Sequence, residues 1–142
     1  MSANSIEGQV KAGFMAALAL DKKADGLKIL KVSEQTSYAD YLVLCSAASE
    51  RQAQAVARHI IDELRLAGLR PLGQEGMNQG HWVLLDYGEV VVHIFFEGAR
   101  SYYDLDGFWV DAPSETIDEA ASLALLKEVI AARVEERKPA AL

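Results

Sequence analysis

A chain of 142 residues and 15.5 kDa is the size of one ordinary domain. A domain of this size can bury enough apolar surface to be stable without disulfide bonds or other cross-links. Hydrophobic residues make up 51% and charged residues 25%, which excludes disorder along the whole chain. The single cysteine, Cys45, excludes a disulfide framework and a multi-cysteine zinc site, and the net charge of −7 argues against a basic nucleic-acid surface.

An apolar run over residues 12–20 resembles neither a membrane span nor a secretory signal. It is shorter than the ~20 apolar residues that a transmembrane helix needs. It also lacks the positive flank of a signal peptide, because Glu7 and Lys11 cancel. We therefore expect a cytoplasmic protein in which this run is one face of a helix and Cys45 is reduced and buried.

The first elements follow from hydrophobic spacing. Apolar residues at helical intervals predict a helix over residues 5–20, and residues 27–32 read as a strand. Residues 41–45 form a continuous apolar run, which is typical of a strand covered on both faces. Ser49 and Gln52 form a capping box that opens a second helix, and Gly68 favours its termination.

The second half begins with residues 73–80, which contain three glycines and are predicted to be a mobile loop. Residues 82–86 and 89–96 then read as two strands of a hairpin. Because side chains alternate along a strand, Trp82, Leu84 and Asp86 should share one face.

Two further helices are expected towards the C-terminus. One is short and covers residues 98–105, and the other opens at a capping box of Thr116 and Glu119 and runs to about Arg137. The apolar stripe of the last helix is Leu123, Leu126, Ile130 and Val134. Interleaved helices and strands favour an α/β fold with a mixed sheet flanked by helices, plus a C-terminal helix.

Negative charge is concentrated between residues 82 and 111. Residues 1–81 carry nine acids and nine bases, whereas residues 82–111 carry six acids and one base, Arg100. That segment also gathers aromatic residues, among them Trp82, Tyr102, Tyr103, Phe108 and Trp109. Acidic charge and aromatic anchors together suggest a binding surface for a basic partner. The alternative is a solvated charged face whose aromatic residues belong to the core.

Patterns for metal, cofactor or covalent chemistry are weak, and we expect no metal, no cofactor and no catalytic residue. The three histidines show no i, i+4 pair, and His93 is expected in or near the core. Residues 104–107 resemble the opening of a calcium loop, but apolar residues follow where acids are required. The turn at residues 46–49 has no phosphate-binding glycine motif and reads as a helix cap.

Four ordered motifs carry a resemblance to a known family. They are Ser37-Tyr-Ala-Asp-Tyr41, Arg70-Pro-Leu-Gly-Gln-Glu-Gly76, the run from Trp82 to His93, and Tyr102 to Trp109. Over about residues 5–110 the chain resembles the ribosomal silencing factor family, also called the Iojap family. Residues 1–111 are accordingly predicted to be the family domain, and residues 112–142 a C-terminal helical extension.

The resemblance implies a nucleotidyltransferase-like fold without that activity. It implies binding to the large ribosomal subunit through large-subunit ribosomal protein fourteen. This binding would block joining of the small subunit and repress translation in starvation. The resemblance also implies a protein that is often a homodimer in isolation. The partner-binding residues that it implies are Trp82, Asp86, Gly88, Tyr102, Tyr103 and Leu105.

One enzymatic alternative stays open from the sequence: a small nucleotide-using transferase that acts through Asp86, Asp104 and Asp106. Phosphoryl and nucleotidyl transfer by metal ions requires acids placed to hold them. The strand after the Ser46–Ser49 turn carries only one acid, Asp86, which favours the non-enzymatic interpretation.

Overall fold

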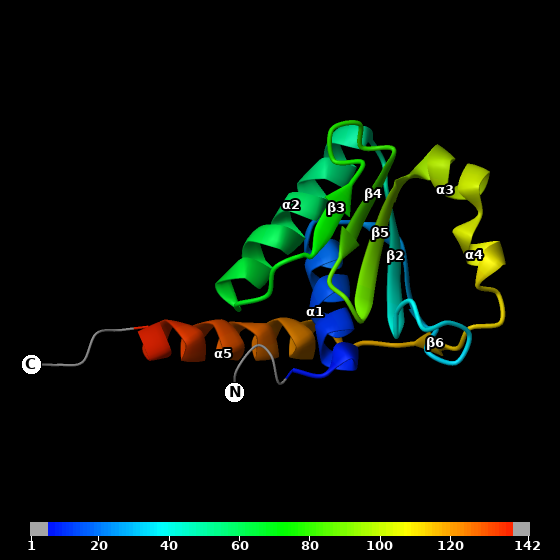
Figure 1. Cartoon of the computed structure of the whole chain (residues 1–142). Coiled ribbons are helices and arrows are strands. Elements are labelled where there is room, and N and C mark those ends of the chain that lie inside the picture. The colour runs from blue at the N-terminus through cyan, green and yellow to red at the C-terminus, as the bar shows by residue number, and fades with distance from the viewer. Residues whose placement is uncertain (1–5, 138–142) are drawn as a thin grey trace, which may run out of the picture.

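The computed structural model describes residues 6–137 as a sheet with helices on both sides (Figure 1). The six strands have the order β3-β4-β5-β2-β1-β6, and β2 and β5 are the parallel pair. This confirms the predicted mixed α/β fold with a C-terminal helix. The elements are α1 (Gly8–Asp21), β1 (Asp25–Lys31), β2 (Tyr41–Ala47), α2 (Glu50–Leu66), β3 (Gly73–Glu75), β4 (Trp82–Asp86), β5 (Val90–Phe96), α3 (Glu97–Tyr103), α4 (Leu105–Phe108), β6 (Ser114–Glu115) and α5 (Glu119–Arg137).

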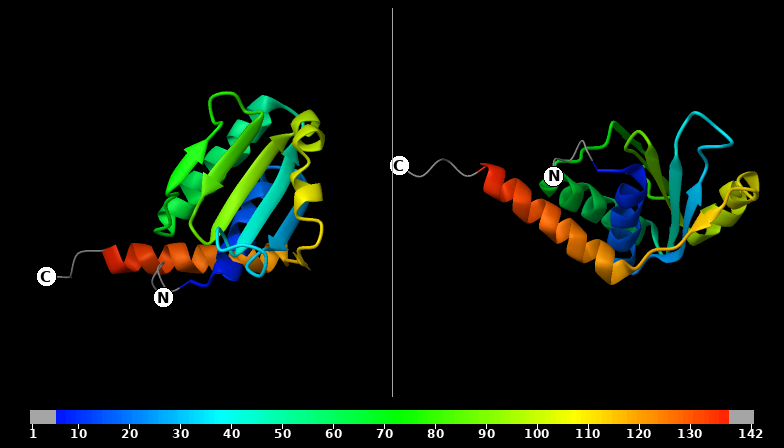
Figure 2. Two further views of the ribbon diagram at one scale, coloured as in Figure 1. Left: turned by 45° about the vertical axis from the view of Figure 1, so that its right-hand side comes forward. Right: turned by 90° about the horizontal axis from the view of Figure 1, so that it is seen from below.

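The two faces of the sheet are covered unequally (Figure 2). Helices α1, α2 and α5 lie on one face and enclose the larger core, which includes Phe14, Val43 and Ile60. On the other face, α3 and α4 cover a smaller apolar cluster that includes Leu42 and Phe95. The β4 side of this second face has no helix over it, which leaves part of the sheet open.

The central strands are buried on both faces, as the apolar run of residues 41–45 predicts. In β2 all residues after Tyr41 are buried, and in β5 all residues before Phe96 are buried. Cys45 is fully buried, and burial raises the pKa of its thiol to about 12. A thiol in this setting stays protonated at neutral pH. The prediction that Cys45 is buried is confirmed.

Helix α2 has the ends that its sequence predicts. Ser49 Oγ accepts from the Gln52 N–H at 3.0 Å, while Gln52 Oε1 accepts from the Ala48 N–H at 2.7 Å, one residue earlier than in a standard capping box. At the other end, Gly68 has φ of 86° and donates to the Arg65 carbonyl. The positive φ explains why glycine ends this helix.

Residues 73–80 are only partly the loop that three glycines suggested, because residues 76–80 form a turn and residues 73–75 do not. Residues 73–75 form β3, which pairs antiparallel with β4. Gly76 turns the chain at φ of 78°, and a Cβ there would collide with the Trp82 carbonyl oxygen. This glycine therefore serves a tight turn against β4, and the predicted mobility of residues 76–80 stays a prediction.

The helices after β5 also differ in detail from the expectation. The short helix is two helices, α3 and α4, because Asp104 between them adopts a left-handed φ of 49° and caps α4 through the Gly107 N–H. The cap of α5 is Asp118, whose Oδ1 accepts from the Ala121 N–H at 3.0 Å, and not Thr116. In the predicted stripe of α5, Leu126 is buried, whereas Val134 is 52% exposed.

Residues 114–137 join the main body of the fold. β6 pairs with β1, and α5 packs across α1, with Gly13 of α1 facing Ser122. The functional division at residue 111 stays a prediction. Within residues 6–137, no helix has the length and apolar character needed to cross a membrane.

Tyr87 offers a test of the larger core. Its side chain is buried there, and its hydroxyl has no hydrogen-bond partner within residues 6–137. A buried hydroxyl without a partner is unfavourable, so Tyr87→Phe should raise the free energy of unfolding by about 1 kcal/mol. Urea unfolding measures the change. A loss of stability in Tyr87→Phe would mean that the hydroxyl makes a favourable contact.

Candidate partner-binding face

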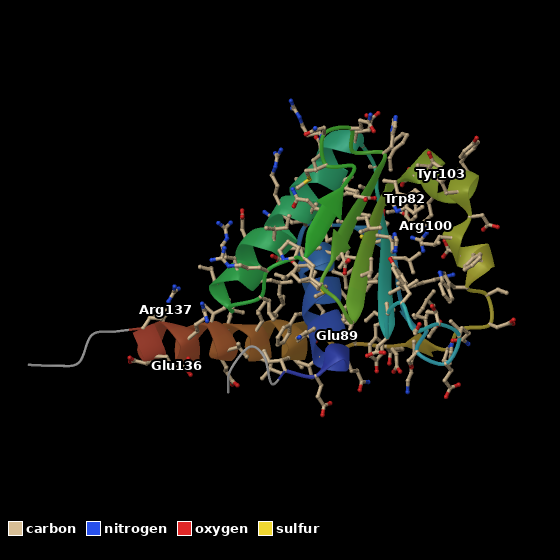
Figure 3. The ribbon with its side chains drawn as sticks, in the orientation of Figure 1. Trp82, Glu89, Arg100, Tyr103, Glu136 and Arg137 are labelled. Atoms are coloured by element: carbon tan, nitrogen blue, oxygen red, sulfur yellow. The ribbon has the colours of Figure 1, made fainter. Side chains whose placement is uncertain are left out.

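The open part of the sheet is built by alternation along β4. Trp82, Leu84 and Asp86 are half-buried and share this face, whereas Val83 and Leu85 point into the larger core. Helix α3 borders the same face, and Figure 3 shows Trp82, Tyr103 and Arg100 gathered between the sheet and α3. We call this surface, made by β3, the open side of β4 and α3, the open face.

An aromatic row occupies the α3 end of the open face. The Trp82 ring stacks on Phe95 with centroids 5.1 Å apart and contacts Tyr103 at 4.8 Å. Tyr103 meets Tyr102 edge-on at 5.1 Å, and the Tyr102 side chain is 81% exposed. The row therefore runs from the core to solvent, with its outermost ring free to contact a partner.

The buried His93 side chain orients Trp82 through a hydrogen bond. The two residues lie on neighbouring strands, and Trp82 Nε1 donates to His93 Nδ1 at 2.9 Å. Burial lowers the pKa of His93 to about 4, so the ring is neutral at pH 7 and Nδ1 can accept. The expectation of a core histidine is confirmed, and the hydrogen bond adds a role in orienting Trp82.

Two acidic side chains belong to the open face: Asp86 lies at the far end of β4, and Glu75 of β3 lies opposite Leu84 in the middle of β4. Asp86 Oδ1 accepts from the Gly88 N–H at 2.8 Å, in a turn where Gly88 has φ of 89°. Burial raises the pKa of the nearby Tyr38 hydroxyl, and the carboxylates of Asp86 and Glu75 raise it further. A cationic group approaching β3 and β4 on the open face would meet these two negative charges.

The predicted site residues thus fall into separate groups. Trp82, Tyr102 and Tyr103 form one cluster, while Asp86 and Gly88 lie at the far end of β4. Leu105 is half-buried and packs on the smaller apolar cluster under α4. Its place in a partner contact stays a prediction.

Arg100 fastens α3 and α4 to the sheet, a role that its sequence context did not reveal. Its Nε and Nη2 donate to the two carboxylate oxygens of Asp106 at 3.0 and 2.9 Å. Its Nη1 donates to the Gly26 carbonyl at 2.6 Å and to Ser46 Oγ at 2.9 Å. Lys28 adds a second ion pair to Asp106, and these hydrogen bonds hold the pKa of that carboxyl well below its usual range. Arg100 is the only base among residues 82–111, and this was the sequence signal from which its role could have been predicted.

The three acids of the enzymatic alternative lie in different settings. Asp86 bonds to the turn at Gly88, Asp104 caps α4, and Asp106 pairs with Arg100 and Lys28. In the part of the chain that the structure describes, no group of three or more histidine, cysteine or acidic side chains is placed to hold a metal ion. The geometry supplies an exposed aromatic and acidic surface suited to binding.

Fold and open face together define an α/β protein whose sheet carries an aromatic and acidic surface on one side. The family model described as "Ribosomal silencing factor during starvation" matches residues 4–141. The chain belongs to this ribosomal silencing factor family.

Individual relatives agree with this assignment. A Bacillus subtilis protein named ribosomal silencing factor is 40% identical over 103 residues, which cover 72% of this chain and 87% of the relative. A crystal structure of a Chromobacterium violaceum protein matches with a TM-score of 0.72 and 33% identity, covering 73% of this chain and 87% of that one. A Bacillus halodurans structure matches with a TM-score of 0.69 and 31% identity, covering 77% and 99%.

The His93 contact predicts a pH dependence of stability. The folded pKa of about 4 lies below the ordinary value of 6.5, so between these values the unfolded chain takes up a proton that the folded protein excludes. The free energy of unfolding should therefore fall as pH drops through this window, by about 2 kcal/mol between neutral pH and pH 4.5 from this group. His93→Gln keeps an acceptor for Trp82 and does not titrate. Urea unfolding should show a smaller fall in this variant, and an equal fall would contradict the assignment.

The hydrogen bonds of Arg100 lead to a prediction about how firmly α3 and α4 are attached to the sheet. Arg100→Met removes four hydrogen bonds and leaves Asp106 with Lys28 alone, which should weaken the attachment of α3 and α4 by about 2 kcal/mol. Hydrogen exchange of residues 97–108 measures it. The matched control is Arg65→Met, which breaks an exposed pair with Asp62 and should have little effect. Unchanged exchange in Arg100→Met would contradict the role of this residue.

Proposed function

We propose that this protein silences ribosomes in the cytoplasm by binding the large subunit with its open face and thereby blocking attachment of the small subunit. The observation that carries the proposal is the aromatic row that runs from half-buried Trp82 on β4 to the exposed Tyr103 and Tyr102 of α3, beside the open part of the sheet. Membership in the ribosomal silencing factor family supports the ribosome as the partner. No catalytic step is required, because occupying the subunit interface is sufficient.

The proposed contact on the large subunit is ribosomal protein fourteen, as the family resemblance implies. Charge supports a basic protein as the partner, since residues 82–111 carry six acids and one base. Asp86 and Glu75 on the open face would be repelled by rRNA phosphates and attracted by lysine and arginine side chains. Asp86, Gly88 and Leu105 are proposed to join the aromatic row in this contact.

Subunit joining in a purified system, followed by light scattering, tests the proposal. Saturating wild-type protein should prevent the scattering increase. Trp82→Ala should need about thirtyfold more protein, because truncating an aromatic anchor typically costs at least ~2 kcal/mol. Asp86→Lys should also weaken inhibition, through charge reversal.

Controls separate contact from folding. Tyr102→Ala truncates a ring that is 81% exposed, so it should weaken inhibition and leave the fold intact. Leu66→Ala and Asp62→Lys make matching changes at exposed positions of α2 and should inhibit like wild type. Unimpaired joining with wild-type protein would refute silencing, and full inhibition by folded Trp82→Ala and Tyr102→Ala would refute the placement of the site.

The C-terminal helix is proposed to lie outside this contact, because α5 packs on α1 on the opposite side of the sheet. A chain that ends at Ala132 keeps Leu126 and Val129, the buried residues of α5. It should cosediment with large subunits as the full chain does. A folded shortened chain that fails to cosediment would place the end of α5 in the interface.

The resemblance also implies a homodimer in isolation, and we propose that such a dimer exists apart from the ribosome. Analytical ultracentrifugation of the full chain tests this. A monomer across the accessible concentration range would reject it.

A further inference from the structure

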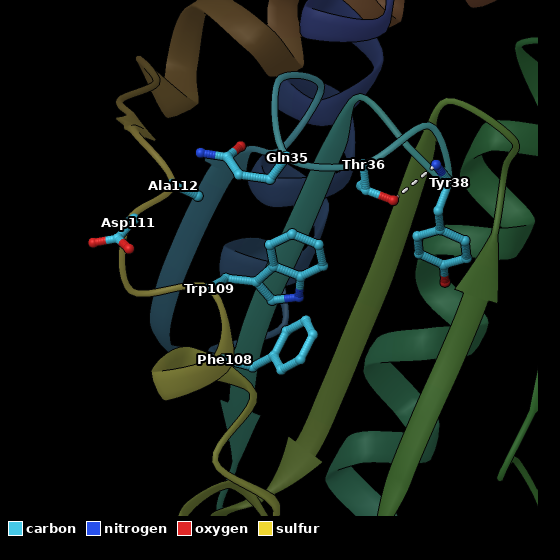
Figure 4. Close-up of a pocket in the computed structure, with 7 residues that line it drawn as sticks. All are labelled: Gln35, Thr36, Tyr38, Phe108, Trp109, Asp111 and Ala112. Carbon is cyan, nitrogen blue, oxygen red and sulfur yellow. Dashed lines mark hydrogen bonds between the residues drawn. The ribbon is translucent and has the colours of Figure 1, made fainter.

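A groove lies on the side of the sheet that α3 and α4 partly cover, apart from the aromatic row. It is a groove of about 530 Å³ between the loop that joins β1 to β2 and the chain that follows α4 (Figure 4). Its walls are formed by seven residues, none of them basic: Gln35, Thr36, Tyr38, Phe108, Trp109, Asp111 and Ala112. Neither the family resemblance nor the proposed contact assigns a role to this groove.

Three aromatic rings line the groove and two of them are exposed. Phe108 is 75% exposed and meets Trp109 edge-on with centroids 5.0 Å apart. Tyr38, which is 56% exposed, stands across the groove from this pair (Figure 4). Ring faces attract a cation through their quadrupole, so a groove between such rings suits an ammonium or guanidinium group.

The charge around the groove favours the same kind of occupant. Asp111 lines it, and the carboxylates of Asp86 and Glu75 act on Tyr38 strongly enough to raise the pKa of its hydroxyl beyond the effect of burial. With no basic side chain in its walls, the groove has aromatic and acidic walls that complement a positively charged side chain.

Hydrogen-bonding groups in the walls fit a polypeptide. Trp109 Nε1 makes no hydrogen bond within residues 6–137, so its N–H can donate to a backbone carbonyl of a bound chain. The Tyr38 N–H donates to Thr36 Oγ1 at 3.1 Å, which holds the loop in the conformation that forms the wall. Aromatic-lined grooves are a recurring way to bind extended peptide segments.

We propose that this groove binds an extended basic segment of the partner protein, with one lysine or arginine side chain seated between Tyr38 and the Phe108–Trp109 pair. The identity of the partner rests on the proposed function. The preference for a cationic side chain rests on the rings and carboxylates of the groove alone. The groove would give the partner a second contact beyond the aromatic row at Trp82.

Binding of a short peptide tests the groove directly. The ¹⁵N-labelled full chain is titrated into the millimolar range with a capped glycine-serine peptide that carries one central arginine, and the indole resonances of Trp82 and Trp109 are followed. The Trp109 resonance should shift. The same peptide with citrulline, which keeps the shape and loses the charge, should bind about 5- to 30-fold more weakly.

Variants of exposed residues complete the test. Phe108→Ala and Tyr38→Ala should abolish the Trp109 shift, whereas Val110→Ala, which changes a side chain that is 75% exposed and outside the groove, should bind like wild type. Equal affinity for arginine and citrulline peptides would overturn the proposal. So would the absence of any shift, or a shift confined to Trp82.

Cosedimentation with large subunits separates this proposal from the proposed function. Weakened cosedimentation of folded Phe108→Ala and Tyr38→Ala supports the groove as a contact with that partner. Wild-type cosedimentation of both variants, with Tyr102→Ala defective, overturns the groove contact and leaves the proposed function standing. Arginine-dependent binding at Trp109 without any subunit binding by wild type overturns the proposed function and retains the cation site.

Discussion

The pairing of β2 with β5 is the constraint on which the rest of the structure depends. Both strands are apolar along nearly their whole length, so both of their faces must be covered. Helices α1, α2 and α5 cover one face, while the short helices α3 and α4 cover the other. Because α3 and α4 are short, they leave the β4 side of that face open, and this is the surface that we propose for partner binding.

The positions of the aromatic rings on the open face depend on how α3 and α4 are attached to the sheet. Arg100 joins α3 to β1, β2 and α4 through its hydrogen bonds to Gly26, Ser46 and Asp106. This attachment places Tyr103 against Trp82, whose indole is oriented by a neutral His93. A part-buried ion pair and a buried histidine thus set the positions of the Tyr103 and Trp82 rings. Truncating either anchor should alter binding through geometry as well as stability.

Much of the fold could be predicted because its strongest signals are local. The apolar run at residues 41–45, the caps at Ser49 and Gly68, and the alternation along residues 82–86 each act within a few residues. The short strands β3 and β6 were missed because two or three residues carry no readable period, and their partners are distant in sequence.

The candidate site was predictable only in part, because many of its contacts join residues that are distant in sequence. Alternation correctly places Trp82 and Asp86 on one face, but it says nothing about what lies beneath them. The contacts of Arg100 join three segments that are far apart in the chain, and Tyr38 comes from a polar loop with no aromatic pattern. Such convergence arises from tertiary structure, so no sequence window contains it.

The most direct test of the account is a cryo-electron microscopy reconstruction of the full chain bound to purified large ribosomal subunits. The account predicts that β4 and α3 face a ribosomal protein, that Trp82 and Tyr102 lie in the contact, and that α5 points away from it. A reconstruction in which the layer of α1, α2 and α5 meets the ribosome, with the open face turned to solvent, would contradict it.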